Sequence, residues 1–220
     1  MAISSSSGVD NGKFHDFLLQ PTEITKVACQ TLINMAESTT RGKWEEAMVN
    51  VGNGMERPIK EIRDCGRIIW DDFDMVATIW ARIRDQVPEV LTLKDQQLIT
   101  GYGPVRRNET WKMSRLNERM RFLKYQEGQY FKPHEDGSYV TPDGKEISFY
   151  TLHLYLNSNP GGGGATTFHS DFLDREVNVE PKPGRVLIFQ HRGLLHSGAD
   201  VTRGTKYTMR TDLMYKKVDE

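Results

Sequence analysis

The sequence is poor in cysteine and has no long hydrophobic run. Cys29 and Cys65 are too few for a disulfide framework or a thiolate zinc cluster, and no C-x-x-C motif occurs. No stretch approaches the roughly 20 apolar residues of a membrane span, and residues 1–12 are polar, without the apolar segment of a secretory signal. We therefore expect a cytoplasmic protein without a membrane partner, and a nuclear location is also compatible.

Neither sign of charge dominates the chain. The 29 basic and 30 acidic residues leave a formal charge of −1, so no general field attracts nucleic acid, and we predict none as a partner. Binding is expected at a local site instead. The length of 220 residues suits one well-packed domain. We predict a disordered tail over residues 1–12 and a single domain over residues 13–220; the oligomeric state is not specified.

Two helices are predicted before any strong strand. From residue 21 an apolar stripe follows the helical period, with Thr22 as the N-cap; its members are Ile24, Val27, Ala28, Thr31, Leu32 and Met35. A second stripe follows Asp71 and Asp72, whose charges suit a helix N-terminus, and it ends before Pro88. Its members are Phe73, Val76, Ala77, Trp80 and Ile83.

The second half of the chain has the texture of β-strands. Runs rich in β-branched and aromatic residues cover 119–125, 148–157, 185–189 and 206–215, and glycine, proline, aspartate and asparagine separate them. Helices followed by such runs indicate an α+β, mainly β fold, in which the helices support an antiparallel barrel or double sheet. Residues 101–111 and 158–174 are glycine-containing segments that could form lids, and the glycine run 161–164 could equally be a solvent loop.

One short segment has the spacing of a metal site. In an extended chain residues i and i+2 project from the same face, so His134 and Asp136 can direct an imidazole and a carboxylate to one point. Two histidines and one carboxylate form the facial triad of non-heme Fe(II) oxygenases, which leaves open coordination positions. A second histidine must come from a distant strand, and His191 and His196 are both candidates.

Several ordered motifs between residues 121 and 215 resemble the Fe(II)/2-oxoglutarate dioxygenases, in particular their prolyl 4-hydroxylase-like branch. They are RFLKYQEG from 121, HED from 134, LYLN from 154, the glycine run 161–164, PGRVLIF from 183, HSG from 196 and VTRGTKY from 201. The resemblance implies a double-stranded β-helix (jelly roll) with N-terminal supporting helices. It favours His196 as the third iron ligand, because a basic residue about ten positions further on, here Lys206, pairs with the far carboxylate of 2-oxoglutarate in that branch.

The same resemblance assigns further residues. Tyr125 and Tyr155 fall where relatives place tyrosines that hydrogen bond the cosubstrate, and Arg210 shares a strand face with Lys206. Thr151 and His153 share the face of Tyr155 and are weaker candidates for substrate contacts. His153 departs from the aliphatic residue usual in the family. Arg121, on the same strand parity as Tyr125, is a further weak substrate-contact candidate.

The implied cofactors are Fe(II), 2-oxoglutarate and O2, with ascorbate for sustained activity. The leading prediction is hydroxylation of a C–H bond in a prolyl or other amino-acid residue, free or in a peptide. A small secondary metabolite is the alternative substrate for the same chemistry. A non-catalytic jelly-roll module that binds metal or ligand, and a zinc hydrolase, are alternatives of other classes.

Overall fold

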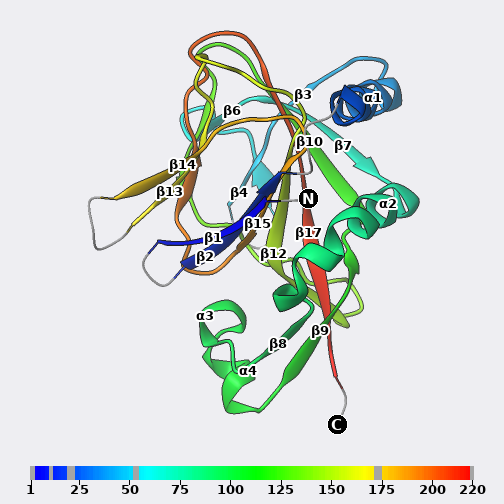
Figure 1. Ribbon diagram of the computed structural model, residues 1–220, viewed down its shortest axis with the longest axis vertical. Coiled ribbons are helices and arrows are strands. Elements are labelled where there is room, and N and C mark those ends of the chain that lie inside the picture. Colours follow the sequence, from blue (N-terminus) through cyan, green and yellow to red (C-terminus); the bar gives the residue numbers. More distant parts are fainter. Residues whose placement is uncertain (1–2, 10–11, 19–22, 52–54, 171–174, 219–220) are drawn as a thin grey trace.

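Most strands belong to two antiparallel sheets that face each other (Figure 1). The computed structural model describes residues 3–9, 12–18, 23–51, 55–170 and 175–218. The larger sheet has the order β1 (Ile3–Val9), β2 (Gly12–Leu18), β15 (Arg185–Gln190), β12 (Glu146–Tyr155), β17 (Lys206–Lys217), β10 (Arg119–Tyr125), β7 (Gly66–Asp71) and β3 (Glu45–Glu46); β9 (Thr110–Leu116) also pairs with β17 and carries β8 (Thr92–Lys94).

The smaller sheet supplies the other wall. Its order is β14 (Glu176–Val179), β13 (Thr166–His169), β16 (His196–Gly198), β11 (Tyr130–His134) and β6 (Arg63–Asp64), and β4 (Val49–Asn50) with β5 (Glu56–Arg57) forms a separate ribbon. The four predicted strand runs coincide with β10, β12, β15 and β17 and differ from them by at most two residues at either end. The mainly β double-sheet prediction is therefore confirmed.

The two long helices pack on the outer face of the larger sheet, beside β7 and β9 (Figure 1). They are α1 (Glu23–Thr39) and α2 (Phe73–Ile83); short helices follow at Arg84–Gln86, Pro88–Val90, α3 (Gln97–Thr100) and α4 (Tyr102–Arg106). No helix in the described part of the chain has the length and apolar character needed to cross a membrane.

The buried face of α1 differs from the predicted stripe. Cys29, Ile33 and Ala36 are buried, whereas Val27 is 64% exposed and Met35 is 37% exposed. Both sets follow the helical period, so periodicity alone could not choose between two faces that lie about one residue apart. The predicted N-cap, Thr22, lies outside the described residues.

Helix α2 begins where the sequence predicts. The side chain of Asp72 caps it, because Oδ1 accepts a hydrogen bond of 2.8 Å from the backbone N–H of Met75. Val76 and Ile83 are buried as predicted, but Phe73 is 61% exposed. Phe73 stands at the first turn and lies under the guanidinium of Arg115 instead of facing the sheet.

Strand alternation separates the core into two layers. On β12, Leu152 and Leu154 face the helices and join the large outer cluster, while Tyr155 belongs to a cluster between the two sheets. On β10, Leu123 and Tyr125 likewise point between the sheets. Side chains on the inner faces of these strands therefore point into the space between the two sheets.

Three segments differ from the expected loops and tail. Residues 3–9 of the predicted tail form β1, which pairs with β2. Residues 101–111 contain α4 and the start of β9. The glycine run packs closely on residues 200–203: a Cβ at Gly163, whose φ is +69°, would lie 2.3 Å from the Asp200 carbonyl oxygen. The packing fixes this part of the predicted lid in place.

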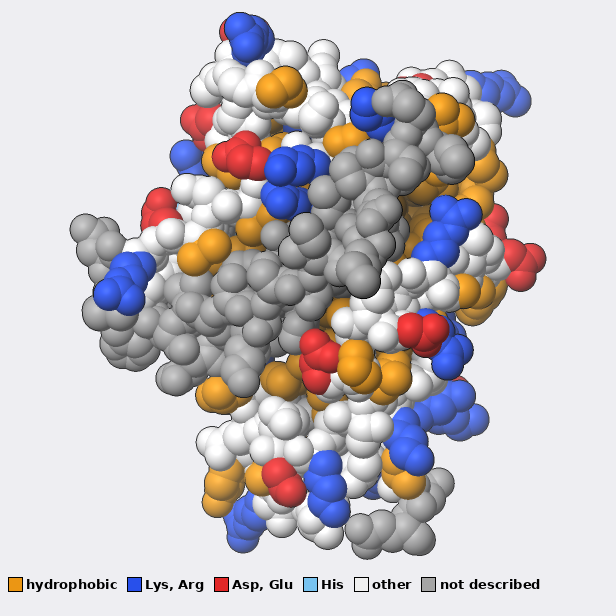
Figure 2. Space-filling view, in the orientation of Figure 1, with side chains coloured by type: hydrophobic (Ala, Val, Ile, Leu, Met, Phe, Trp, Pro, Cys, Tyr) orange, Lys and Arg blue, Asp and Glu red, His pale blue; other side chains and the backbone are white. Residues whose placement is uncertain are grey.

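The face seen in Figure 2 carries basic and acidic side chains interspersed with one another. This distribution agrees with the near-zero net charge of the sequence.

Candidate metal centre and cosubstrate pocket

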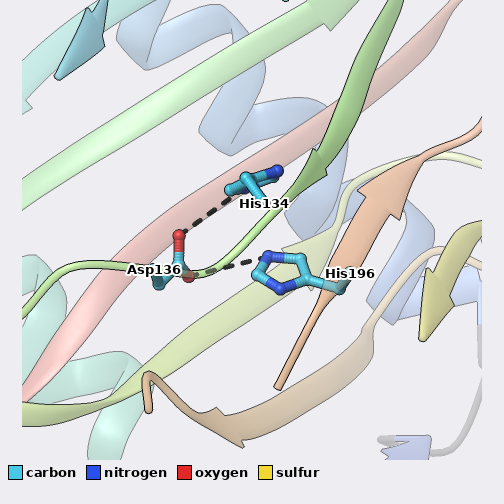
Figure 3. Close-up of side chains that lie close together, drawn as sticks. All are labelled: His134, Asp136 and His196. Carbon is cyan, nitrogen blue, oxygen red and sulfur yellow. Dashed lines mark ion pairs between the residues drawn. The ribbon is translucent and has the colours of Figure 1, made fainter. Parts of the chain in front are cut away.

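Three side chains converge at the ends of two neighbouring strands of the smaller sheet (Figure 3). His134 ends β11, Asp136 follows it by two residues, and His196 begins β16, where it pairs in register with His134. Their candidate ligand atoms all lie within 4.8 Å of one another. Oδ1 of Asp136 is 3.7 Å from Nε2 of His134, and Oδ2 is 3.8 Å from Nε2 of His196.

Backbone carbonyl groups orient both histidine rings. Nδ1 of His134 lies 2.8 Å from the Lys132 carbonyl oxygen, and Nδ1 of His196 lies 3.0 Å from that of Leu194. When Nδ1 carries the proton and donates it to these carbonyls, Nε2 presents its lone pair to the centre of the triad. Phe131 stacks on the ring of His134 and further restricts it.

Burial keeps the histidines in the state that binds metal. It lowers the pKa of His134 to about 3, and it lowers the pKa of His196 as well. Both rings are therefore neutral near pH 7. Burial alone would raise the pKa of Asp136, but the Arg210 guanidinium and the neighbouring histidine rings together outweigh it and hold this pKa well below its usual value. Two neutral imidazoles and one carboxylate are the donor set that suits Fe(II).

Two polar side chains hold the Asp136 carboxylate. The Thr151 hydroxyl donates a hydrogen bond of 2.6 Å to Oδ2, and Nη1 of Arg210 lies 2.9 Å from Oδ1. Arg210 also reaches Asp212, at 3.5 Å between Nη2 and Oδ1. Thr151 and Arg210, which the sequence suggests as contacts of substrate and cosubstrate, are thus placed against a candidate metal ligand.

His191 lies apart from this group. Its ring is buried, Nε2 is 3.8 Å from Oδ1 of Asp212, and neither ring nitrogen has a hydrogen-bond partner among the described residues. The described residues that could hold a metal ion as a group are His134, Asp136 and His196. The structure therefore brings His196 and not His191 to the site.

A cavity opens beside the three candidate ligands. Lys206 lines it and is 2% exposed. Its Nζ lies 5.1 Å from the ring centroid of Tyr125 and 5.7 Å from that of Tyr155. Burial lowers the pKa of Lys206 to about 8, so the amine is still mostly protonated near pH 7.

The two tyrosines occupy different positions around Lys206. Tyr125 lines the cavity. Tyr155 is fully buried, and its hydroxyl donates to the carbonyl oxygen of Val179 and contacts Thr166. Thr166 is the residue that lines the cavity at that point. The sequence analysis did not single out Thr166, because a threonine in a short strand carries no distinctive signal.

The remaining candidates are divided between the cavity and its surroundings. His153 lines the cavity, and its Nε2 is buried without a hydrogen-bond partner among the described residues. Burial, together with the charges of Lys206 and Arg210, lowers the pKa of His153 well below its usual value. Arg121 pairs with Asp212 at 3.4 Å and is not among the residues that line the cavity.

Arg63 is a cavity-lining residue that sequence reasoning missed. It belongs to β6, a strand of two residues without a periodic pattern. Its position beside β11 depends on pairing with a segment about 70 residues away, Tyr130 with Asp64 and Phe131 with Arg63, and such non-local pairing has no local sequence signal.

A double sheet that carries a two-histidine, one-carboxylate group is the arrangement of the jelly-roll non-heme iron oxygenases. Residues 120–211 match the 2OG-Fe(II) oxygenase superfamily. The matched segment contains the three candidate ligands and Lys206, and together with that group it supports a 2-oxoglutarate-dependent dioxygenase with Fe(II) as its cofactor. No curated protein matches the sequence.

Solved structures of prolyl hydroxylases share the fold. A prolyl-4-hydroxylase of Pseudomonas putida is 15% identical, with a TM-score of 0.59 and 91% of each chain covered. The viral collagen prolyl hydroxylase of Paramecium Bursaria Chlorella virus-1, in its 2OG complex, is 19% identical, with a TM-score of 0.55 and coverage of 92% of this chain and 96% of that one. A Trichoplax adhaerens prolyl hydroxylase with a hypoxia inducible factor peptide fragment is 14% identical, with a TM-score of 0.61 and coverage of 92% and 83%.

Proposed function

We propose that the protein hydroxylates a C–H bond in a prolyl or other amino-acid residue, free or in a peptide, with His134, Asp136 and His196 as its iron ligands. The observation that carries this proposal is the convergence of the three ligand side chains at a cavity that also holds a buried lysine. A site for metal alone would have no use for that lysine, whereas a dicarboxylate cosubstrate needs a cation at the inner end of its pocket.

Different residues would bind the iron, the cosubstrate and the substrate. His134, Asp136 and His196 would hold the iron, which supplies the oxidative chemistry when bound. Lys206 would bind the far carboxylate of 2-oxoglutarate, with Tyr125 beside it. Thr151 and Arg210 would keep the Asp136 carboxylate oriented. His153 lines the same cavity with a ring nitrogen that has no partner in the described part of the chain, and it would contact a polar group of the substrate.

The substrate class rests on the shared fold. The three similar structures are prolyl hydroxylases, and one of them carries a peptide. The identities of 14% to 19% are too low to transfer a substrate by themselves. The proposal therefore commits to an amino-acid residue and leaves its sequence context to experiment.

The first experiment is an anaerobic titration of the Fe(II)-loaded protein with 2-oxoglutarate, followed by the visible charge-transfer band of the chelate. We expect the band in the wild type and its loss in His196→Ala. Succinate release under air is then measured with proline-containing peptides, free amino acids and a set of secondary metabolites, and mass spectrometry locates the added oxygen atom.

Each outcome of these experiments supports or overturns a stated part of the proposal. Stimulated succinate release and an oxygenated amino-acid residue support the proposal. Turnover with a secondary metabolite alone would overturn the substrate class and keep the chemistry. If no band formed and zinc were retained in preference to iron, a binding module or a zinc hydrolase would replace the proposal.

A further inference from the structure

Arg63 is a buried cation without a carboxylate partner in the described part of the chain. It is 7% exposed. Its Nη1 donates a hydrogen bond of 3.3 Å to the carbonyl oxygen of Met48, and its Nε has no hydrogen-bond partner among the residues that the structure describes. A buried guanidinium is normally compensated by an acidic group, because transfer of a charge out of water is costly. The Arg63 guanidinium lies over the Phe131 ring, 4.5 Å from its centroid, and no described carboxylate neutralises its charge, which leaves that charge available to a bound anion.

A neighbouring arginine shows the usual arrangement. Arg67 on β7 is buried to the same degree, at 6% exposed. Its guanidinium lies 3.1 Å from Oε2 of Glu56 and 3.7 Å from Oε2 of Glu45. Arg67 does not line the cavity, whereas Arg63 does. The arginine that faces the cavity is thus the one that lacks a protein counter-ion.

Arg63 and Lys206 flank the same tyrosine from opposite sheets. Burial lowers the pKa of Arg63, but the neighbouring Tyr125 and Cys65 side chains raise it above its usual value. On the other side, Nζ of Lys206 lies 5.1 Å from the ring centroid of Tyr125. Two buried cations therefore meet around one phenol at the wall of the cavity.

We propose that Arg63 is a second anchor for the far carboxylate of 2-oxoglutarate, acting together with Lys206. This inference rests on the proposed role of Lys206 and deepens it. A carboxylate has two oxygens, and a lysine offers a compact charge while an arginine offers a planar fork of donors, so the two side chains can share one carboxylate from different sides. Arg63 thereby becomes a residue that selects for a dicarboxylic 2-oxo acid.

The selection can be measured with two 2-oxo acids that differ at one end. 2-Oxobutyrate retains the 2-oxo acid group and lacks the far carboxylate. The charge-transfer band gives the dissociation constant of each acid for the Fe(II)-loaded protein without oxygen. We expect Arg63→Gln to weaken 2-oxoglutarate binding by about tenfold to a hundredfold, the range of one charge-assisted hydrogen bond, and to change 2-oxobutyrate binding by no more than about twofold.

Two further variants separate the proposed role from a structural one. Arg67→Gln removes an equally buried arginine that is outside the cavity, and it should leave both dissociation constants unchanged. Arg63→Lys keeps the positive charge but loses the planar set of guanidinium donors. It should weaken 2-oxoglutarate binding less than Arg63→Gln does and leave 2-oxobutyrate binding unchanged. Because the two anchors share one carboxylate, the effects of Arg63→Gln and Lys206→Ala should be non-additive in the double variant.

Equal weakening of both acids by Arg63→Gln would mean that Arg63 only supports the fold of the pocket, and it would overturn the proposal. Unchanged binding of 2-oxoglutarate would do the same. If Arg63→Gln does not fold, as checked by circular dichroism, the comparison of acids in Arg63→Lys decides. Absence of the band in the wild type with either acid would instead refute the proposed function, a result distinct from the failure of Arg63 alone.

Discussion

The hydroxyl of Thr151 donates a hydrogen bond of 2.6 Å to Oδ2 of Asp136. Both side chains are buried, Thr151 completely. The bond crosses between the sheets, since Thr151 lies in the middle of β12 in the larger sheet and Asp136 follows β11 of the smaller one. A rigid strand therefore fixes a carboxylate that stands just beyond the end of its own strand.

Thr151→Val is expected to weaken metal binding without unfolding the protein. Valine keeps the shape of threonine and removes the hydroxyl, so Asp136 loses one orienting bond, and such changes around metal sites typically cost about 10- to 100-fold in affinity. Isothermal titration with Mn(II), a redox-stable probe, gives the affinity. Thr211→Val is the control, because the Thr211 hydroxyl donates to the carbonyl oxygen of Asn117 away from the site. Equal affinities in the two variants would contradict the role of Thr151.

Arg210→Gln is expected to destabilise the metal-free protein most. The change leaves the buried carboxylates of Asp136 and Asp212 without their shared cation, which costs about 3 kcal/mol for a buried pair. A bound metal ion supplies positive charge at Asp136, so Mn(II) should recover part of this loss. Urea denaturation with and without Mn(II) measures both.

The control for Arg210 is Arg119→Gln, which breaks an exposed pair with Asp71. An exposed pair contributes at most about 1 kcal/mol, and metal should have no effect on that loss. If Mn(II) left the deficit of Arg210→Gln unchanged, the coupling between Arg210 and the metal centre would be refuted.

His196→Ala should abolish metal binding, and His191→Ala should preserve it. His196 offers Nε2 to the group formed with His134 and Asp136, whereas His191 points to Asp212. Because His191 is buried, its removal leaves a cavity and lowers stability, so metal content is compared at a temperature where both variants are folded. If His196→Ala retained iron, His191 would replace His196 as the candidate for the third metal ligand.

Binding of 2-oxoglutarate should weaken as the pH rises through about 8. Burial lowers the pKa of Lys206 to about 8. The charged amine is present below this pH and attracts the far carboxylate, and it is lost above it. The dissociation constant from the charge-transfer band should be flat between about pH 6 and 7.5 and then increase.

Variants at position 206 test whether Lys206 causes the pH dependence of 2-oxoglutarate binding. Lys206→Arg keeps its charge across the range and should remove the pH dependence. Lys206→Ala should still bind iron but require at least about tenfold more 2-oxoglutarate. If Lys206→Ala left the requirement unchanged, the role of Lys206 as the anchor of the far carboxylate would be refuted.

Much of the fold is encoded in local patterns. The runs at 119–125 and 206–215 became β10 and β17 because a β-type run bounded by turn residues is a local signal for a strand. Asp72 correctly predicted the start of α2, because a capping side chain bonds to the backbone within one turn of its own position. The predicted buried face of α1 was wrong. The helix has two overlapping apolar stripes, and packing against the sheet buries the one with Cys29, Ile33 and Ala36.

By itself the sequence determined which chemical groups were available, and in what local order: the spacing of His134 and Asp136, a later histidine, and Lys206 on an alternating strand. Only the tertiary structure decided which of these groups meet. The register of β11 with β16 brought His196 to the centre, and the pairing of β6 with β11 brought Arg63 to the cavity. The reason is physical: side-chain direction follows from the local backbone, whereas strand pairing between distant segments is settled by the packing of the whole core.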